Sequence, residues 1–341
     1  MRRFDTAAAP HLPARGSVRG LMLEVQLALL PGLLMQSWFF GHGVLLQVLL
    51  AIGFGLGIEA LCLRLRGRPL GPFLGDGSTV LAATLFALCL PPLAPWWMAA
   101  IGMLAAIGLA KHAYGGLGGN LFNPAMVGYA VVLLSFPLQA SQWPGVSDTS
   151  HYGLIEALRV VMLGAAPATG WDALTAATPL DALRQLGGQG LTLGEMQADP
   201  RFAESGPGAW GWIASAHAVG GLWLLARRRI PWHAPAGLLG SVVLLSLLPW
   251  ALDPDLHPSP MWHVATGATV LGAFFIVTDP VSGCASPRGR LLFGAGVGLL
   301  LLAIRRWGTY PDALAFAVLL MNCAAPMLDR YTRPRVYGAP R

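Results

Sequence analysis

The chain has 341 residues, of which 55% are hydrophobic and only 11% are charged, and its formal net charge is +6. Soluble domains carry about 25% charged residues, so this chain cannot cover a water-facing surface and lipid must cover much of it. The composition excludes an ordinary soluble enzyme, and no interleaving of aromatic and basic residues indicates a nucleic-acid-binding protein.

The first segment, residues 1–20, is rich in arginine and contains Arg2, Arg3, Arg15 and Arg19. A secretory signal peptide would place a short apolar core and a small-residue cleavage site after such charges, and neither follows here. We therefore interpret residues 1–20 as a cytoplasmic N-terminal segment.

Ten apolar runs follow, and runs of about 20 apolar residues are long enough to cross a bilayer as helices. They predict an all-α polytopic membrane protein with one repeat of five helices over 21–138 and a second over 210–328. Residues 139–209 form a polar insertion between the repeats, and 329–341 form a C-terminal tail. The predicted spans are 21–39, 43–63, 77–91, 95–113, 122–138, 210–227, 235–252, 262–279, 290–306 and 311–328.

Loop charges predict the orientation, because cytoplasmic loops carry an excess of lysine and arginine. Basic residues fall on alternate loops, which places both termini in the cytoplasm of a bacterial inner membrane and the 139–209 insertion outside. The pair Arg305-Arg306 is an exception, since it falls at an outer end. The basic loop residues are Arg64, Arg66, Arg68, Lys111, Arg227, Arg228, Arg229, Arg288, Arg290, Arg330, Arg333 and Arg335.

The two halves share three landmarks in the same order. GSTVLAATLF from Gly77 matches GATVLGAFFI from Gly267, and PAMVGYAVVLL from Pro124 matches PDALAFAVLLM from Pro311. Between them, a basic pair beginning at Lys111 matches Arg305-Arg306. Because five helices is an odd number, the second copy must insert upside down, as in the inverted repeats of many transporters. The inversion would explain the outer position of the second basic pair.

A glycine-rich break, YGGLGGNLFNP over 114–124, interrupts the first repeat. Inverted repeats often hold ligands at interrupted helices between their halves. We therefore predict that the backbone from Gly115 to Asn123 lines a cavity between the halves. The alternative is a tight turn between two helices.

Within the insertion, Thr178 precedes Pro179 and has Asp181 three residues later. A threonine N-cap, a proline at the first helical position and an acid in the first turn are typical of a helix start. A helix start also favours a phosphate, because its backbone N–H groups are unpaired and its dipole end is positive. The hydroxyl of Thr178 could carry such a phosphate as an ester, so the two interpretations are compatible.

The residues around Thr178 resemble a modification motif. Asp172, Thr175, Ala177 and Thr178 match the D-x-x-[ST]-x-A-T pattern that flavin transferases recognise when they attach FMN, through its phosphate, to the last threonine. Ala176 departs from the pattern, in which glycine is common at this position. Alanine is compatible with it if the backbone φ angle there is negative.

Longer stretches resemble the D subunits of Rnf (Rsx) electron-transport complexes, a family that includes the B subunit of sodium-pumping NADH:quinone reductase. The resemblance covers essentially the whole chain and is carried by KHAYGGLGGNLFNPAMVGYAVVLLSFP (111–137), TDPVSGCASPRGR (278–290), GTYPDALAFAVLLMNCAAP (308–326) and RYTRPRVYG (330–338).

This resemblance implies a membrane electron carrier with covalent FMN on Thr178 outside the membrane. It also implies a flavin transferase for maturation and partner subunits that include a second flavinylated subunit and Fe–S subunits. The complex would couple electron transfer between NADH and ferredoxin to Na⁺ or H⁺ transport. A second, noncovalent flavin such as riboflavin between the repeats is a further expectation. The chain itself offers no nicotinamide or Fe–S motif, so it would be one subunit of an enzyme.

Four carboxylates are candidates for an ion path, because acids inside membranes are costly and often mark such paths. Glu24 and Glu59 lie in apolar runs, while Asp76 and Asp279 lie at the cytoplasmic ends of repeat-related segments. The alternatives are that the glutamates contact water or an arginine, and that the aspartates lie at the ends of helices, where they act as caps. The four cysteines share no CxxC spacing and the histidines are scattered, so we expect no metal site.

Two rival functions remain open from the sequence. One is a small-solute or ion channel built on the same inverted repeat, and the other is a passive helical scaffold, because a fold does not define a function. The threonine motif favours the redox subunit, since neither a channel nor a scaffold would need it.

Overall fold

The computed structural model describes residues 17–146, 152–167, 170–308, 310 and 312–333. These residues are mostly helical, and their only strand-like pairing is an isolated bridge between Pro144 and Thr175. The all-α class predicted from the sequence is therefore correct for the described part of the chain.

Among the described residues, four helices are long and apolar enough to cross a membrane. They are α1 (Val18–Phe40), α2 (Gly43–Leu65), α14 (His233–Leu252) and α17 (Pro287–Trp307), and each coincides with a predicted span. Large apolar side chains such as Leu34, Trp38, Leu49, Leu244 and Leu248 are exposed on them. A polytopic membrane protein buries such surfaces in lipid, so the helices support a multi-pass protein.

The other six predicted spans coincide with helices that are shorter, less apolar or interrupted. The total of ten spans therefore remains a prediction. These helices are α4 (Ser78–Leu88), α5 (Trp96–Met103) continued by the π-helix η1 (Leu104–His112), α6 (Pro124–Ser135), α13 (Pro207–Ala226), α15 (Pro260–Ala265) with α16 (Thr269–Leu271) and the π-helix η3 (Gly272–Ile276), and α18 (Leu314–Thr332).

The break between α15 and α16 has a local cause. Gly267 has a φ angle of +64°, a backbone conformation that favours glycine and stops the helix. The hydroxyl of Thr269 then donates to the carbonyl of His263 at 2.9 Å, so a side chain replaces a backbone partner at the break. Buried, broken helices of this kind are tolerated where protein satisfies the freed backbone groups.

Helix packing follows one pattern in both halves. In the first half, α2 packs against α4, α5 and η1, and in the second, α14 packs against α15, η3 and α17. Across the halves, α1 packs against α13 and α6 against α18. An inverted repeat predicts these pairings, although the repeat itself remains a prediction.

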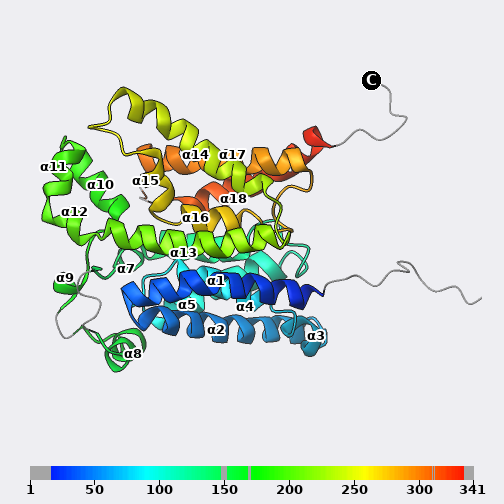
Figure 1. Cartoon of the computed structure of the whole chain (residues 1–341). Coiled ribbons are helices and arrows are strands. Elements are labelled where there is room, and N and C mark those ends of the chain that lie inside the picture. Colours follow the sequence, from blue (N-terminus) through cyan, green and yellow to red (C-terminus); the bar gives the residue numbers. More distant parts are fainter. Residues whose placement is uncertain (1–16, 147–151, 168–169, 309, 311, 334–341) are drawn as a thin grey trace, which may run out of the picture.

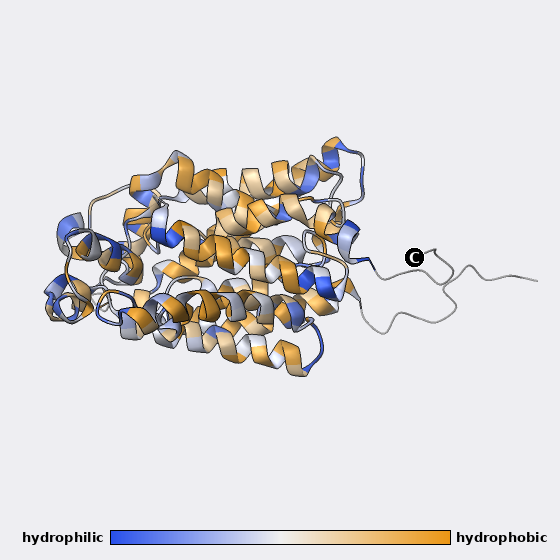
Figure 2. Ribbon diagram, turned by 90° about the horizontal axis from the view of Figure 1, so that it is seen from above, coloured by the Kyte–Doolittle hydropathy of each residue, from blue (hydrophilic) through white to orange (hydrophobic). Residues whose placement is uncertain are grey.

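The two ends of the bundle differ in content. The start of α1 and the end of α18 lie at one end, whereas α8 to α12 gather at the other (Figure 1). Figure 2 shows hydrophobic residues along the middle and hydrophilic residues towards both ends. Which end faces the cytoplasm remains a prediction. The short helices are α3 (Leu70–Leu74), α7 (Pro137–Ala140), α8 (Leu154–Leu163), α9 (Trp171–Leu174), α10 (Pro179–Gly188), α11 (Leu193–Ala198) and α12 (Pro200–Glu204).

Candidate functional site

A cavity of about 360 Å³ opens between the halves at the end of the bundle that carries the insertion. We call it the insertion-end cavity. Its walls come from α1, α4, α6, α13 and α18, and the first residues of α10 close one side. Four aromatic side chains line it: Tyr129, Trp143, Trp210 and Tyr310. The cavity is thus largely apolar, with few polar groups.

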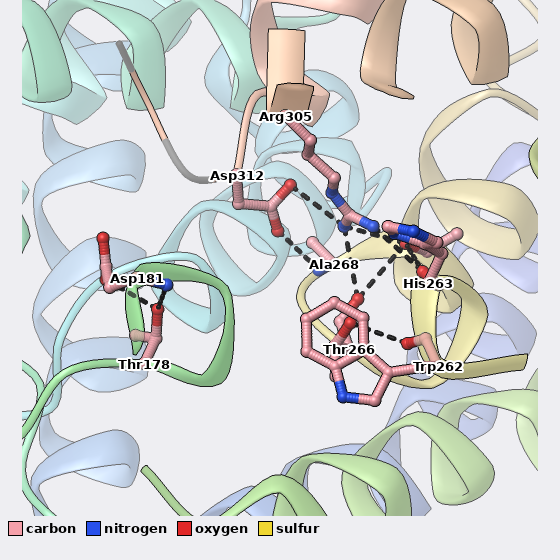
Figure 3. A network of polar contacts seen from close by, with 9 residues as sticks. Thr178, Asp181, Trp262, His263, Thr266, Ala268, Arg305 and Asp312 are labelled. Atoms are coloured by element: carbon pink, nitrogen blue, oxygen red, sulfur yellow. Dashed lines mark hydrogen bonds and ion pairs between the residues drawn. The ribbon is translucent and has the colours of Figure 1, made fainter. Parts of the chain in front are cut away.

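Thr178 lies in the wall of this cavity and caps α10. Its hydroxyl accepts the backbone N–H of Asp181 at 3.3 Å and donates to the carboxylate Oδ2 of Asp181 at 2.6 Å. The predicted helix start, with Pro179 at the first position, is therefore confirmed. Figure 3 shows this pair of residues on one side of the site.

The other motif residues lie beside Thr178 but do not line the cavity. Thr175 ends α9 and donates its hydroxyl to the Trp171 carbonyl at 2.8 Å. Asp172 is exposed, and Ala177 packs against the small core of α10 to α12. Ala176 has no positive φ angle, so alanine fits its backbone. Of the two threonines, only Thr178 faces the cavity.

A polar network lies across the cavity from Thr178, and we call it the Arg305 cluster (Figure 3). Arg305 donates to the carbonyls of His263 and Thr266 at 2.9 and 3.2 Å and to the hydroxyl of Thr269 at 2.9 Å. The carboxylate of Asp312 lies 3.4 Å from Arg305 and accepts the backbone N–H of Ala268 at 2.6 Å.

Gly267 brings the Arg305 cluster close to α10. A Cβ atom at this position would lie 2.5 Å from Oδ2 of Asp312 and 2.7 Å from Cδ1 of Leu180. Only a glycine permits this approach, and Leu180 is two residues after Thr178. The alignment of the two basic pairs correctly predicts Arg305 at this end, whereas no pattern in the sequence indicates Asp312 as a site residue.

A second cavity, of about 300 Å³, lies between the halves at the opposite end, and we call it the terminus-end cavity. Leu117, Asn120 and Asn123 of the glycine-rich break line it. The predicted cavity beside this break is therefore confirmed for those three residues. The glycines themselves form the turn, because Gly115, Gly116 and Gly118 have positive φ angles.

A second buried network, the Lys111 cluster, adjoins this cavity. The ammonium group of Lys111 lies 2.5 Å from Oε1 of Glu59 and 2.9 Å from the hydroxyls of Ser78 and Thr79. Thr79 also donates to Glu59. The side chains of Lys111 and Glu59 are 4% and 2% exposed. Glu59 is therefore paired with a lysine, Lys111, and not with water or an arginine.

The other ion-path candidates also have partners. Glu24 binds Arg229 of the segment between α13 and α14, with Arg227 at 3.6 Å. Asp76 accepts the backbone N–H of Ser78 at 2.7 Å, as a carboxylate does at a helix start. Asp279 lines the terminus-end cavity and accepts the Ser282 hydroxyl at 2.7 Å. The ion path through these four carboxylates stays a prediction.

In the described part of the chain, no group of three or more His, Cys, Asp or Glu side chains is placed to hold a metal ion. The four cysteines are free thiols.

Comparisons with known proteins identify the family. The model of the NQR2, RnfD, RnfE family matches residues 5–338. The chain belongs to this family. Among its members, it is 50% identical to the D subunit of the ion-translocating oxidoreductase complex of Aeromonas hydrophila, with 99% of each chain covered. It is 51% identical to the corresponding protein of Pseudomonas aeruginosa, with 97% of this chain and 94% of that protein covered, and 46% identical to that of Shewanella amazonensis, with 98% of each covered.

Proposed function

We propose that this chain is the flavin-carrying membrane subunit of an ion-translocating oxidoreductase complex, with FMN joined to Thr178 through a phosphoester. The names of its relatives and its apolar helices support the membrane-subunit role. The motif from Asp172 to Thr178 supports the covalent flavin, and it is present in full apart from the alanine at position 176.

The observation that carries the proposal is the position of Thr178, with its hydroxyl at a helix start in the wall of the insertion-end cavity. A phosphate on that oxygen would meet the positive end of the α10 dipole. The cavity volume of about 360 Å³ is within the range of small-molecule sites. Trp143, Trp210 and Tyr129 offer flat apolar surfaces for an aromatic ring. The residues present therefore fit a flavin attached at Thr178.

FMN held there would supply reversible electron transfer, which none of the side chains can. The chain's own residues would bind and orient it. The aromatic walls would exclude water, and Asp312, fixed by Ala268 and Arg305, would present a carboxylate to the cavity. Because the cavity lies at the insertion end, this carrier would exchange electrons with a second flavinylated subunit outside the membrane.

The terminus-end cavity is our candidate for a second, noncovalent flavin such as riboflavin. Its volume of about 300 Å³ is at the lower limit of small-molecule sites. Asn120 and Asn123 supply amide groups on its wall. Riboflavin has no phosphate, so the site needs no anion-binding helix start.

The wider setting follows the family resemblance. We infer ten spans in two inverted repeats, both termini in the cytoplasm and the insertion outside a bacterial inner membrane. The NADH- and ferredoxin-dependent steps and the Fe–S centres would belong to partner subunits. Coupling would move Na⁺ or H⁺, with Glu24, Glu59, Asp76 and Asp279 as candidate path residues.

The test is flavin fluorescence of the chain after denaturing electrophoresis, with the protein produced together with a flavin transferase. A covalent flavin survives denaturation, so we expect a fluorescent band at the mass of this chain. Production without the transferase is the control and should give no fluorescence. A dark band in both samples would favour the channel or scaffold alternatives.

A further inference from the structure

Two helix starts in the insertion each pair a threonine cap with an acid three residues later. Thr178 with Asp181 begins α10, and Thr192 with Glu195 begins α11. In both, the carboxylate of the acid three residues later accepts a hydrogen bond from the threonine hydroxyl, at 2.6 Å and 2.7 Å between the oxygens. Glu195 also accepts the backbone N–H of its own cap residue, at 2.8 Å. The second pair is a complete capping box, and in both pairs the carboxylate lies within hydrogen-bonding distance of the threonine hydroxyl.

Their surroundings differ as well. Glu195 is exposed, and its hydrogen bonds from Thr192 lower its pKa. Asp181 lines the insertion-end cavity, and burial raises its pKa, against the hydrogen bonds from Thr178 and the charge of Arg184. A carboxylate with a raised pKa is a stronger base. Asp181 is therefore better suited than a capping acid to accept a proton.

We propose that Asp181 is the catalytic base of flavin attachment and takes the Thr178 hydroxyl proton as that oxygen attacks phosphorus. This inference rests on the proposed function. The donor would be flavin adenine dinucleotide, a phosphoanhydride brought by the transferase. The bond formed is from Thr178 Oγ1 to the flavin phosphorus, and the bond broken is the anhydride P–O bond. AMP leaves with the bonding electron pair, the proton moves to Asp181, and no group is oxidised or reduced.

The proton should then stay on Asp181. The ester oxygen Oγ1 lies 2.6 Å from the carboxylate, so the negative charge on the non-bridging oxygens of the new phosphodiester is close to Asp181, and two anions so close repel each other. A protonated Asp181 instead donates a hydrogen bond to the ester. Three other titratable groups act near it: Arg184 on α10, Asp312 on the loop before α18 and Tyr129 on α6. Of these, Asp312 further disfavours a second negative charge.

The experiment measures the initial rate of flavin incorporation into the full-length chain in detergent, produced without transferase. Purified transferase and flavin adenine dinucleotide are added, and labelling is followed by intact mass between pH 5 and 9. Asp181→Asn keeps the shape and an accepting oxygen but removes the base. We expect its rate to fall on the order of 10²-fold, the usual scale of general-base catalysis, with Asp181→Glu restoring part of it.

Glu195→Gln is the matched control, because it alters the same kind of cap contact on α11, and its rate should equal that of the wild type. The wild-type rate should fall as the pH falls through the raised pKa of Asp181, whereas the Asp181→Asn rate should lack that step. A merely structural cap would not produce this pH difference.

An Asp181→Asn rate within twofold of wild type, with Thr178→Val unlabelled, would overturn this inference and leave the proposed function intact. A wild-type chain that takes up no flavin, or a Thr178→Val chain that labels normally, would overturn the proposed function instead. Thermal unfolding of each variant checks that a low rate does not reflect a misfolded chain.

Discussion

The Lys111 and Arg305 clusters occupy matching places in the two halves but are built differently. Each contains the threonine of a G-x-T-V-L landmark, Thr79 or Thr269, hydrogen-bonded at 2.9 Å to a cation from the matching basic pair. In the first half, the acid is Glu59 of α2, with a side chain that is 2% exposed. In the second, it is Asp312, which is 24% exposed and lines the insertion-end cavity.

The first cluster therefore contains a structural ion pair, Lys111 with Glu59, whereas the second contains a carboxylate, Asp312, that is accessible to a ligand in the cavity. Lys111 holds Glu59 at 2.5 Å, so the charges neutralise each other in the protein interior. Arg305 donates mainly to neutral oxygens, and Asp312 lies 3.4 Å away. One end of the bundle thus uses its acid for stability, and the other presents an acid to the proposed flavin cavity.

The largest expected effect comes from breaking the buried pair. Lys111→Met leaves Glu59 as an uncompensated charge, which should lower the free energy of unfolding by about 3–5 kcal/mol. The midpoint of thermal unfolding in detergent measures it. Adding Glu59→Gln to Lys111→Met removes the stranded charge and should recover much of the loss. A Lys111→Met midpoint equal to that of wild type would mean that the pair is not structural.

Asp312→Asn should have a smaller effect, about 1–2 kcal/mol. Arg305 keeps its three neutral partners, and the asparagine oxygen can still accept the N–H of Ala268. Measuring the midpoints of thermal unfolding of Asp312→Asn and Lys111→Met together ranks the two losses of stability. If Asp312→Asn destabilises the protein as much as Lys111→Met does, the contrast between the clusters is wrong.

The smallest effect concerns pH and the second carboxylate of the insertion-end cavity. Because burial raises the pKa of Asp181 in the folded state, the folded protein binds that proton more tightly than the unfolded chain. Its contribution to stability is therefore present below the unfolded pKa and is lost as pH rises through the folded pKa. Asp181→Asn should gain thermal stability relative to wild type between pH 4 and 8.

Glu195→Gln tests the sign of that effect. The pKa of Glu195 is lowered on folding, so its contribution is present above the unfolded pKa and is lost as pH falls. Relative to wild type, Glu195→Gln should therefore lose stability as pH rises to the ordinary glutamate pKa of 4.5 and stay level above it, whereas Asp181→Asn gains stability as pH rises above the ordinary aspartate pKa of 3.8. Parallel pH profiles for the two variants would contradict the different surroundings of the two acids.

Local patterns predicted the parts of this molecule that depend on neighbouring residues. Apolar runs gave the helices, and Thr178-Pro179 gave the start of α10. The alignment of the basic pairs placed Arg305 at the insertion end. These features depend on periodicity, capping and charge along short stretches, which the sequence displays directly.

The missed features depend on contacts between distant residues. Glu24 pairs with Arg229 across 205 positions, and Glu59 with Lys111 across 52, so no local pattern identifies either partner. No local pattern indicates Asp312, because its place in the cluster depends on the contacts that Gly267 and Ala268 make with it in the fold. The alignment of Lys111 with Arg305 could have predicted both clusters, because it places each cation in the same half as one of the two matching threonines, Thr79 and Thr269.

The measurement that tests the central claim most directly is the intact mass of the chain produced with a flavin transferase, with the modified peptide sequenced. Thr178→Val removes the accepting oxygen, and the cap that it loses is worth only about 1 kcal/mol, so the protein should still insert. Thr192→Val loses the equivalent cap of α11 and is the control, while Thr175→Val should impair attachment less. We predict that wild type and Thr192→Val gain the mass of an FMN ester on Thr178 and that Thr178→Val gains none. An undiminished flavin mass on Thr178→Val, or a flavin lost only from Thr175→Val, would contradict the account.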